Sequence, residues 1–208
     1  MKIELLFITP EAEKLIESAG RTSYLSFDKQ GNDSEKRFVR MLIKRGHTSV
    51  LEHAYATFRI SEISRALTHQ LVRHRFCSIT QQSQRYIDEK NFHYIEPSSI
   101  KNNSDAHALF ISLMERIRNA YIELKNLGIK KEDARFVLPN ATESQLVLTA
   151  NLREWRHIIE LRGDLAAQWE IRIMAIEILN ILKQKVPTVF EDFKIIKEKN
   201  IIQRINLE

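Results

Sequence analysis

Hydrophobic and polar positions follow two periodicities along the chain, and together they predict a mixture of strands and helices. Runs rich in β-branched, aliphatic and aromatic residues predict strands at residues 2–9, 49–60, 91–97 and 143–151. Apolar residues at helical spacing predict helices at residues 10–21, 34–46, 61–75, 104–128, 152–162 and 164–184. Because the two kinds of element do not alternate regularly, the pattern favours an α+β fold over a doubly wound parallel sheet.

The ends and faces of the predicted helices carry further information. Residues that start helices or stop them support the boundaries, namely Pro10, Ser34, Gly20 and Gly128. The segment 164–184 is apolar on almost all sides, which is typical of a helix that is buried all round. In a chain of 208 residues such burial is most easily reached against another copy, so we expect a homo-oligomer.

Length and composition place the chain among ordinary globular proteins. It has 208 residues with 43% hydrophobic content, which suits one domain or a compact two-lobed one. The net charge of +5 favours anionic partners such as nucleotides, phosphorylated cofactors or nucleic acid. The single cysteine, Cys77, excludes an intrachain disulfide framework and fits a reducing, cytoplasmic setting. No apolar stretch reaches the ~18 residues that would span a bilayer.

The stretch RHRFCSITQQSQR, residues 73–85, gathers three arginines, a histidine and two serines. Arginine presents a planar fork of donors and stays charged, so this cluster favours a phosphate pocket over a solvated basic face. Only five glycines exist and none forms a phosphate-binding loop, so side chains must hold any phosphate. A basic helix that binds nucleic acid is the second hypothesis, although no known nucleic-acid-binding pattern is present.

Other reactive groupings give weaker signals. His47, Glu52 and His53 could hold a metal, but their spacing matches no common zinc pattern, so we expect hydrogen-bonded histidines and no metal. Cys77 could be a nucleophile activated by the neighbouring arginines, but a lone cysteine in such a position is more often a packing residue. Ser78 and Ser83 lie near His74, but the stretch lacks the orienting acid and the G-x-S-x-G turn of an acyl-transfer site.

The spacing Arg73-His74-Arg75, then Ser78, then Ser83-Gln84-Arg85 closely resembles the signature of the flavin-dependent thymidylate synthases. Four further segments resemble motifs of that family in the same order, from about residue 45 to residue 185: RGHTSVLEH, ARFVLP, TANLREWRHIIELR and AAQWEI.

This resemblance implies a fold, a reaction and a set of partners. The fold would be α+β, with an antiparallel sheet flanked by helices, and residues 1–208 would form a single catalytic domain. Four chains would assemble as a homotetramer with active sites shared between subunits, in the cytoplasm. The reaction would convert dUMP to dTMP, with 5,10-methylenetetrahydrofolate as carbon donor, FAD as hydride carrier, NADPH as reductant and no cysteine nucleophile. Neither nucleic acid nor membrane would be a partner.

The resemblance also implies roles for individual residues. Arg162 would be the catalytic residue, stabilising negative charge that develops on the uracil ring, because arginine cannot act as a general base at ordinary pH. His47 and Glu52 would support the flavin or folate side. Flavin would contact Ser49, Arg73, His74, Arg75, Gln81, Asn151, Leu152, Arg153 and His157. The substrate dUMP would contact Gln70, Leu71, Val72, Arg73, Gln81, Gln82, Ser83, Gln84, Arg85, Arg135 and Arg162, partly through backbone groups.

The chain departs from the family pattern at three places. Many relatives carry Asn-Glu where this chain has Thr80-Gln81, which removes one negative charge near the bound ligands. His157 stands where some relatives have asparagine, and both side chains can form hydrogen bonds. Ala166 replaces a histidine that is common before the AQWE motif. These departures bear on ligand affinity more than on the type of reaction.

Overall fold

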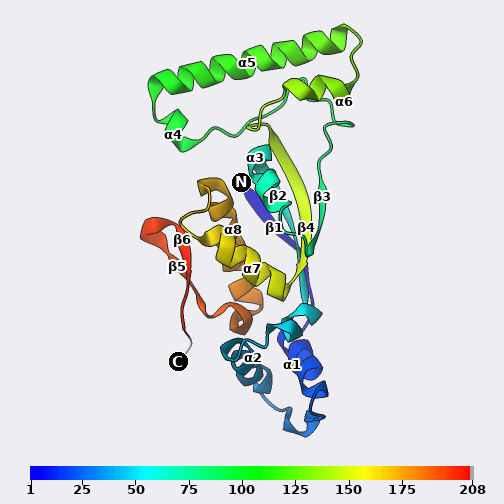
Figure 1. Cartoon of the computed structure of the whole chain (residues 1–208), viewed down its shortest axis with the longest axis vertical. Coiled ribbons are helices and arrows are strands. Elements are labelled where there is room, and N and C mark those ends of the chain that lie inside the picture. Colours follow the sequence, from blue (N-terminus) through cyan, green and yellow to red (C-terminus); the bar gives the residue numbers. More distant parts are fainter. Residues whose placement is uncertain (207–208) are drawn as a thin grey trace. The chain divides into compact units, whose positions relative to one another are not determined.

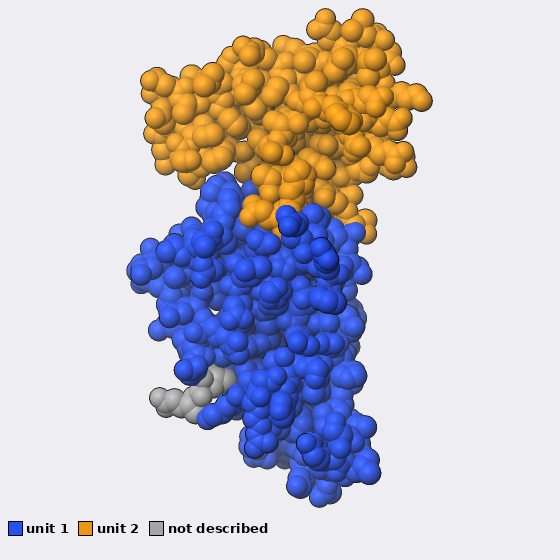
Figure 2. All heavy atoms as spheres, viewed as in Figure 1, with its two compact units in different colours: residues 1–60, 71–79, 147–208 blue, residues 61–70, 80–146 orange. Residues whose placement is uncertain are grey.

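The computed structural model describes residues 1–206, which divide into two compact units (Figure 2). Unit 1 comprises residues 1–60, 71–79 and the chain from residue 147 onward. Unit 2 comprises residues 61–70 and 80–146. The single catalytic domain expected over residues 1–208 stays a prediction.

A four-stranded sheet forms the framework, with the strand order β1-β2-β4-β3 (Figure 1). Its strands are β1 (Lys2–Ile8), β2 (Tyr55–Ser64), β3 (Cys77–Gln81) and β4 (Glu143–Asn151). The Leu152 N–H donates to the Ala54 carbonyl, and the Thr57 and Thr149 hydroxyls share a hydrogen bond. Residue numbers therefore fall along β4 as they rise along β2, as in an antiparallel pair. The expected antiparallel sheet is confirmed.

Helices complete an α+β architecture, also as expected. Unit 1 contains α1 (Ala12–Thr22), α2 (Ser34–Lys44), α7 (Leu152–Gly163) and α8 (Trp169–Lys185). Unit 2 contains α4 (Ser98–Lys101), α5 (Ser104–Asn126) and α6 (Lys131–Ala134), and α3 (Arg65–Leu71) ends at the unit boundary. Short 3-10 turns lie at Phe27–Lys29, Thr48–His53, Arg135–Val137, Pro187–Phe190 and Lys197–Lys199. No helix within residues 1–206 is long and apolar enough to cross a membrane.

The core of unit 1 fixes α7 against the sheet. Trp155 is fully buried, and its indole N–H donates to the carbonyl of Ala56 on β2 at 3.0 Å. Its ring meets Phe58 edge to face, with the ring centroids 5.0 Å apart. An aromatic pair in this geometry adds roughly 0.5–1.5 kcal/mol beyond the burial of its area. The position of α7 is therefore set by buried contacts along its first turns.

A C-terminal hairpin of β5 (Phe193–Ile196) and β6 (Ile201–Arg204) packs on the other end of α7. The guanidinium of Arg156 forms a bidentate ion pair with Asp192 at 2.7 and 2.6 Å, and both side chains are almost fully buried. At the last residue of α7, a Cβ on Gly163 would lie 2.6 Å from Ile202. Only glycine allows so close an approach between the helix end and the hairpin.

The predicted helix over residues 61–75 is wrong at both ends. Strand β2 continues to Ser64, and α3 begins only at Arg65. The N–H groups of Arg65 and Ala66, the first residues of α3, donate to the carbonyls of Thr142 and Asn140, which lie just before β4. The shorter α3 then ends at Leu71. Arg73 and His74 therefore lie beyond the helix and share no helical face with Gln70. The basic stretch continues into strand β3 instead of a loop.

Two residues that were predicted to bound helices, Gly20 and Ser34, have other roles in the structure. Gly20 does not end α1 but lies inside it, where a Cβ would meet the ring of Phe38 on α2 at 2.5 Å. Ser34 does not cap α2, because it is the first helical residue. Its hydroxyl donates to the buried carboxylate of Glu17 and accepts from the Gly31 N–H. Both residues serve contact between neighbouring segments.

Of three further predictions, one is wrong and two hold only in part. Residues 91–97 form no strand and contribute a single bridge, from Tyr94 to Thr142. In the segment 49–60, the first residues belong to the 3-10 turn Thr48–His53, and only the part from Tyr55 onward is strand. Helix α8 starts at Trp169, and within one chain it buries a single face while Ile173 is 39% exposed. The burial of α8 on all sides is therefore not found within one chain.

Candidate functional site

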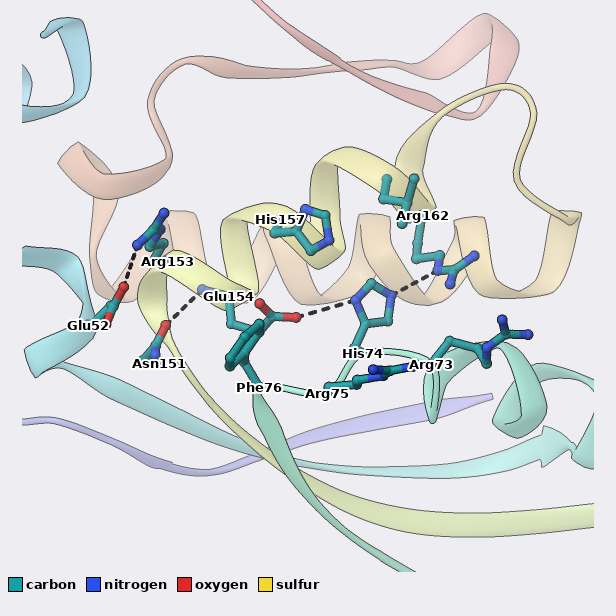
Figure 3. A pocket seen from close by; sticks show the side chains of 11 residues that line it. Glu52, Arg73, His74, Arg75, Phe76, Asn151, Arg153, Glu154, His157 and Arg162 are labelled. Carbon is teal, nitrogen blue, oxygen red and sulfur yellow. Dashed lines mark hydrogen bonds and ion pairs between the residues drawn. The ribbon is translucent and has the colours of Figure 1, made fainter. Parts of the chain in front are cut away.

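A cavity of about 720 Å³ opens in unit 1 (Figure 3). Three segments supply its walls: the 3-10 turn before β2, the turn that follows α3, and the start and exposed face of α7. Its lining residues are Glu52, Arg73, His74, Arg75, Phe76, Asn151, Arg153, Glu154, His157, Leu161 and Arg162. The volume lies in the range of small-molecule and cofactor sites. Four arginines against two glutamates make it a site for anions.

Helix α7 begins at the edge of this cavity. The Asn151 side chain caps it by accepting a hydrogen bond from the Glu154 N–H at 2.8 Å. From this cap, Glu154, His157 and Leu161 follow at spacings of three and four residues, which places them on one side of the helix. The first turn of the helix carries its partial positive charge toward the same cavity. A short sequence segment thus supplies a carboxylate, an imidazole and a cation in fixed positions.

Arg162 reaches across the cavity to the turn after α3. Its Nε donates to Nε2 of His74 at 3.0 Å, although the two residues are 88 positions apart in the sequence. Burial lowers the pKa of Arg162, and the charge of Arg73 lowers it further. A guanidinium nevertheless remains protonated in proteins. The exposed Arg73 and the half-buried Arg162 are therefore like charges close to one another, and an anionic ligand would relieve their repulsion.

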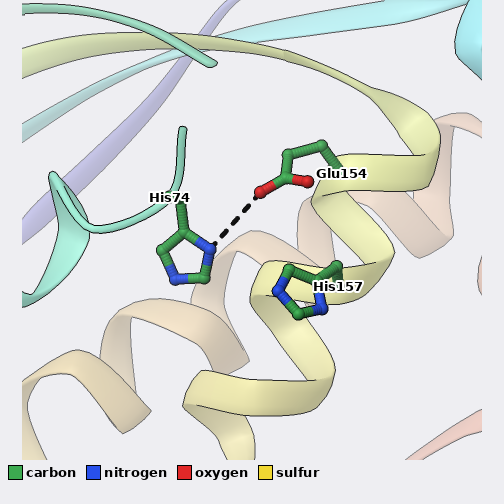
Figure 4. Close-up of side chains that lie close together, drawn as sticks. All are labelled: His74, Glu154 and His157. Atoms are coloured by element: carbon green, nitrogen blue, oxygen red, sulfur yellow. Dashed lines mark ion pairs between the residues drawn. The ribbon is translucent and has the colours of Figure 1, made fainter. Parts of the chain in front are cut away.

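His74 is the buried centre of the cavity wall, with 6% of its surface exposed. Burial lowers its pKa to about 4, with further contributions from Arg162 and His157. The ring is therefore neutral near pH 7. Its Nδ1 lies 3.3 Å from a carboxylate oxygen of Glu154 (Figure 4). Burial also raises the pKa of Glu154, while the nearby His157 and Arg153 oppose that rise.

His74, Glu154 and His157 are the three side chains in residues 1–206 whose positions could together hold a metal ion, with their ligand atoms within 4.8 Å of one another. A metal would need a lone pair of His74, but Nε2 already accepts from Arg162 and Nδ1 faces Glu154. The sequence-based candidate that includes His47 and His53 is not brought together in the described chain. The expectation of no metal stays a prediction.

Cys77 has the environment of a packing residue. Its thiol donates to the backbone carbonyl of His74 at 2.9 Å. Burial raises the pKa of this thiol, and the charge of Glu154 raises it further, so the thiolate is disfavoured. Neither ring nitrogen of His74 bonds a serine in the described contacts, so an acyl-transfer pair is not formed.

Unit 2 carries the rest of the basic stretch, residues 81–85, here called the 81–85 segment. The Gln81 amide donates to the hydroxyls of Thr68 and Ser144, at 3.1 and 3.2 Å. The Gln82 amide donates to the buried carboxylate of Glu89 at 3.4 Å. The Gln84 side chain is buried, and its Nε2 has no hydrogen-bond partner among the described residues. A buried donor without a partner is costly and marks a position where a ligand acceptor would fit.

The arginines of unit 2 lie near acidic groups. Arg85 is half exposed and lies 3.6 Å from the carboxylate of Glu132. Burial lowers the pKa of Arg65, and the charge of Arg135 lowers it further, so these two cations lie near one another. The Nε of Arg135 donates to the backbone carbonyl of Glu132 at 3.0 Å.

Comparisons with known proteins identify the family. The family model described as "Thymidylate synthase complementing protein" matches residues 4–188. A flavin-dependent thymidylate synthase of Geobacter sulfurreducens is 42% identical over 200 residues, which cover 92% of this chain and 86% of that protein. One from Corynebacterium diphtheriae is 40% identical over 201 residues, covering 88% and 80%. This chain belongs to the flavin-dependent thymidylate synthase family.

The fold agrees with a solved structure of the same kind. The crystal structure of Thymidylate Synthase X from Helicobacter pylori with FAD and dUMP superimposes with a TM-score of 0.77 at 24% identity. The match covers 92% of this chain and 98% of that one. The prediction that the chain is an enzyme of the flavin-dependent thymidylate synthase family is confirmed.

The structure brings together seven of the predicted site residues of this family. They line the cavity in unit 1: Arg73, His74, Arg75, Asn151, Arg153, His157 and Arg162. Ser49 and Leu152 lie in unit 1 outside the lining, and Leu152 is fully buried. Leu71 is also buried, while Val72 is exposed, so Leu71 could reach a ligand only through its backbone. The predicted substrate contacts in unit 2 are Gln70, Gln81, Gln82, Ser83, Gln84, Arg85 and Arg135.

Sequence reasoning missed three residues of the cavity wall: Phe76, Glu154 and Leu161. Phe76 is 80% exposed and occupies a position that the signature leaves open. Glu154 could have been found, because it precedes His157 by three residues on a predicted helix. That spacing puts a carboxylate beside an imidazole.

Proposed function

We propose that this chain converts dUMP to dTMP, with 5,10-methylenetetrahydrofolate as carbon donor and bound FAD reduced by NADPH. The observation that carries the proposal is the arginine-lined cavity around Arg162 and His74, in a chain that belongs to this family. Thymidylate Synthase X from Helicobacter pylori was crystallised with FAD and dUMP, which are the two ligands proposed here.

The residues present fit FAD. Its pyrophosphate needs several donors, and the guanidinium groups of Arg73, Arg75 and Arg153 supply them in place of a glycine-rich loop. The cavity of about 720 Å³ suits a cofactor of which part remains outside. Ser49, Gln81 and the cap residue Asn151 are the proposed polar contacts, with the Leu152 backbone. When bound, FAD supplies hydride transfer, and the protein binds and orients it.

The proposed role of Arg162 follows from its positive charge and from the hydrogen bond that fixes its orientation. Its guanidinium is half buried and held by His74, so little reorganisation is needed when negative charge develops on a uracil ring. It acts as an electrostatic stabiliser and not as a base. No cysteine is needed as nucleophile, which agrees with the raised pKa of Cys77.

The dUMP phosphate and sugar are proposed to bind the 81–85 segment and Arg135, with Gln70, Leu71, Val72 and Arg73. The unpartnered Nε2 of Gln84 supports this assignment, since a ligand oxygen would satisfy it. Arginine is the side chain of choice for a phosphate, which it can bind through two parallel hydrogen bonds.

The assembly and setting are also part of the proposal. We propose a single catalytic domain, a homotetramer with active sites shared between subunits, and a cytoplasmic location. Large apolar side chains at the surface support association, among them Tyr24 at 85% and Leu25 at 78% exposure. The proposed partners are small molecules, with neither nucleic acid nor a membrane among them.

Two measurements test the function. The purified protein should be yellow and show flavin absorbance. It should also release tritium from C5-labelled dUMP when NADPH and methylenetetrahydrofolate are present. A folded, FAD-loaded sample that releases no tritium would refute the synthase reaction. A colourless sample that cannot be loaded with FAD would refute the cofactor assignment.

A further inference from the structure

Glu154, His74 and Arg162 form a continuous chain of polar contacts along the cavity wall (Figures 3 and 4). A carboxylate oxygen of Glu154 lies 3.3 Å from His74 Nδ1, and Arg162 Nε lies 3.0 Å from His74 Nε2. The side chains of His74 and Glu154 are 3% and 10% exposed. Water therefore has little access to the imidazole, and its protein partners decide how its nitrogens are used.

The proton on the imidazole can be assigned from its partners. A guanidinium can only donate, so Nε2 of His74 must present a lone pair to Arg162. A neutral imidazole has one N–H, which must then be on Nδ1. That N–H points toward Glu154, which is an acceptor when ionised. The Nδ1–H tautomer is the form of His74 that satisfies both neighbours.

Without an acceptor at Nδ1 its N–H is left buried without a partner, which shifts the equilibrium toward the opposite tautomer. It would place an N–H against the Nε–H of Arg162, and the hydrogen bond that orients the guanidinium would be lost. The backbone at His74 is held separately, by the thiol of Cys77 at 2.9 Å. Loss of the Glu154 carboxylate would therefore change the ring's protonation without releasing the turn that carries it.

Other charged groups near the ring do not replace Glu154. The ring of His157 meets His74 edge to face, with the ring centroids 5.5 Å apart, and Arg73 adds positive charge near Arg162. Arg153 forms an ion pair with Glu52 at 2.5 Å. Among residues 1–206, Glu154 supplies the carboxylate that lies next to Nδ1 of His74.

We infer that Glu154 is a positioning residue: it holds His74 in the Nδ1–H tautomer, and His74 in turn holds the Arg162 guanidinium in its working orientation. The consequence for turnover rests on the function proposed above, whereas the tautomer itself does not. The same division of labour is known where a buried acid fixes the tautomer of a catalytic imidazole.

The tautomer can be measured directly by NMR of protein labelled with ¹⁵N-histidine. The chain has seven histidines, and the spectrum of His74→Asn identifies the signals of His74. At pH 7.5 the wild type should show a protonated Nδ1 and an unprotonated Nε2. Glu154→Gln keeps an acceptor oxygen and should keep this pattern. Glu154→Leu removes the acceptor at similar size and should shift His74 toward the Nε2–H form.

Turnover separates positioning from a purely structural role. Glu154→Gln and Glu154→Leu both remove the negative charge, but only Glu154→Leu also removes the acceptor oxygen that faces Nδ1 of His74. Glu154→Leu should lower kcat by ~10- to 100-fold, the usual effect of removing an outer partner of a site residue, with FAD still bound. Glu154→Gln should stay within about threefold of the wild type on the same scale. The same pair of substitutions at Glu160, a half-exposed residue of α7, is the control.

Several outcomes would overturn the inference. It fails if wild-type His74 is charged or in the Nε2–H form at pH 7.5, and this spectrum alone decides the matter if Glu154→Leu does not fold. It also fails if a folded Glu154→Leu keeps the Nδ1–H form, or if the Gln and Leu variants lose kcat equally. A wild-type protein that makes no dTMP would refute the proposed function and leave the tautomer result standing.

Discussion

Arg162 in unit 1 and Arg85 in unit 2 are both assigned to the same substrate, but their surroundings differ. Arg162 is half buried, and its Nε donates to the neutral imidazole of His74. Arg85 is half exposed and lies beside the carboxylate of Glu132. The first arginine is oriented before a ligand arrives, whereas the second must exchange one anion for another. The contrast predicts that Arg162 serves turnover and Arg85 serves affinity.

The largest effect is expected for Arg162→Ala. Removal of one preorganised donor to developing charge costs ~10²–10³ in kcat. FAD should still bind, because Arg73, Arg75 and Arg153 remain in the cavity wall. Steady-state rates and flavin absorbance check both statements, with Arg37→Ala on an exposed face of α2 as control. An unchanged kcat would remove Arg162 from the catalytic role.

His74 should make folding sensitive to acid. Its folded pKa of about 4 lies below the ordinary value of 6.5, so the unfolded chain binds the extra proton first. The stability it contributes is complete above pH 6.5 and is lost as the pH falls toward 4, by at most about 3 kcal/mol. The free energy of unfolding, measured with urea at several pH values, should fall with the pH in the wild type. It should fall less steeply in His74→Asn. Equal slopes would contradict the buried neutral imidazole.

The wild type must be compared with His74→Asn, because Glu154 changes stability with pH in the direction opposite to His74. Its raised pKa contributes stability that is present at low pH and is lost as the pH rises through its folded value. Arg162 and His157 also face the ring and lower its pKa. The difference between the two proteins isolates the imidazole better than either curve alone.

Arg85→Ala should weaken dUMP binding with little change in kcat. A hydrogen bond to a charged group is worth about 1.5–3 kcal/mol, which corresponds to roughly a 10- to 150-fold rise in the dUMP requirement. Calorimetry with dUMP and the FAD-loaded enzyme measures it directly. If dUMP affinity does not change, the phosphate is held elsewhere.

The smallest effect is expected for Glu132→Gln, and it has the opposite sign. An exposed ion pair is worth ~0.2–1 kcal/mol, so release of Arg85 from its partner should tighten dUMP binding by a few-fold at most. The gain should vanish in the background of Arg85→Ala. Weaker binding of dUMP by Glu132→Gln would show that the carboxylate supports the site instead of competing for it.

Local signals were sufficient for some elements and insufficient for others. Strand β4 over residues 143–151 and the helix that follows it were predictable, because Asn151 stops one pattern and caps the next. The segment 61–75 has helical spacing throughout, yet β2 extends to Ser64 and the helix starts only at Arg65. The first N–H groups of that helix bond the carbonyls of Thr142 and Asn140, about 75 residues away in the sequence. Tertiary hydrogen bonds of this kind leave no trace in a local pattern.

The residues of the candidate site also fall into two groups, those that the sequence could predict and those that it could not. The signature residues from Arg73 to Arg85 could be assigned because their chemistry and spacing are local. The partner of His74 could not be assigned, since it depends on a turn that lies beside a helix some 80 residues further along the chain. Glu154 has an ordinary place in the helical pattern, and only its proximity to the ring gives it a role.

The contact between Gly163 and Ile202 has a practical consequence. Gly163, the residue after Arg162, packs against the C-terminal hairpin. That hairpin lies beyond residue 188, where the match to the family model ends. Deleting that hairpin, or attaching a bulky tag to it, would therefore disturb Arg162, the proposed catalytic residue.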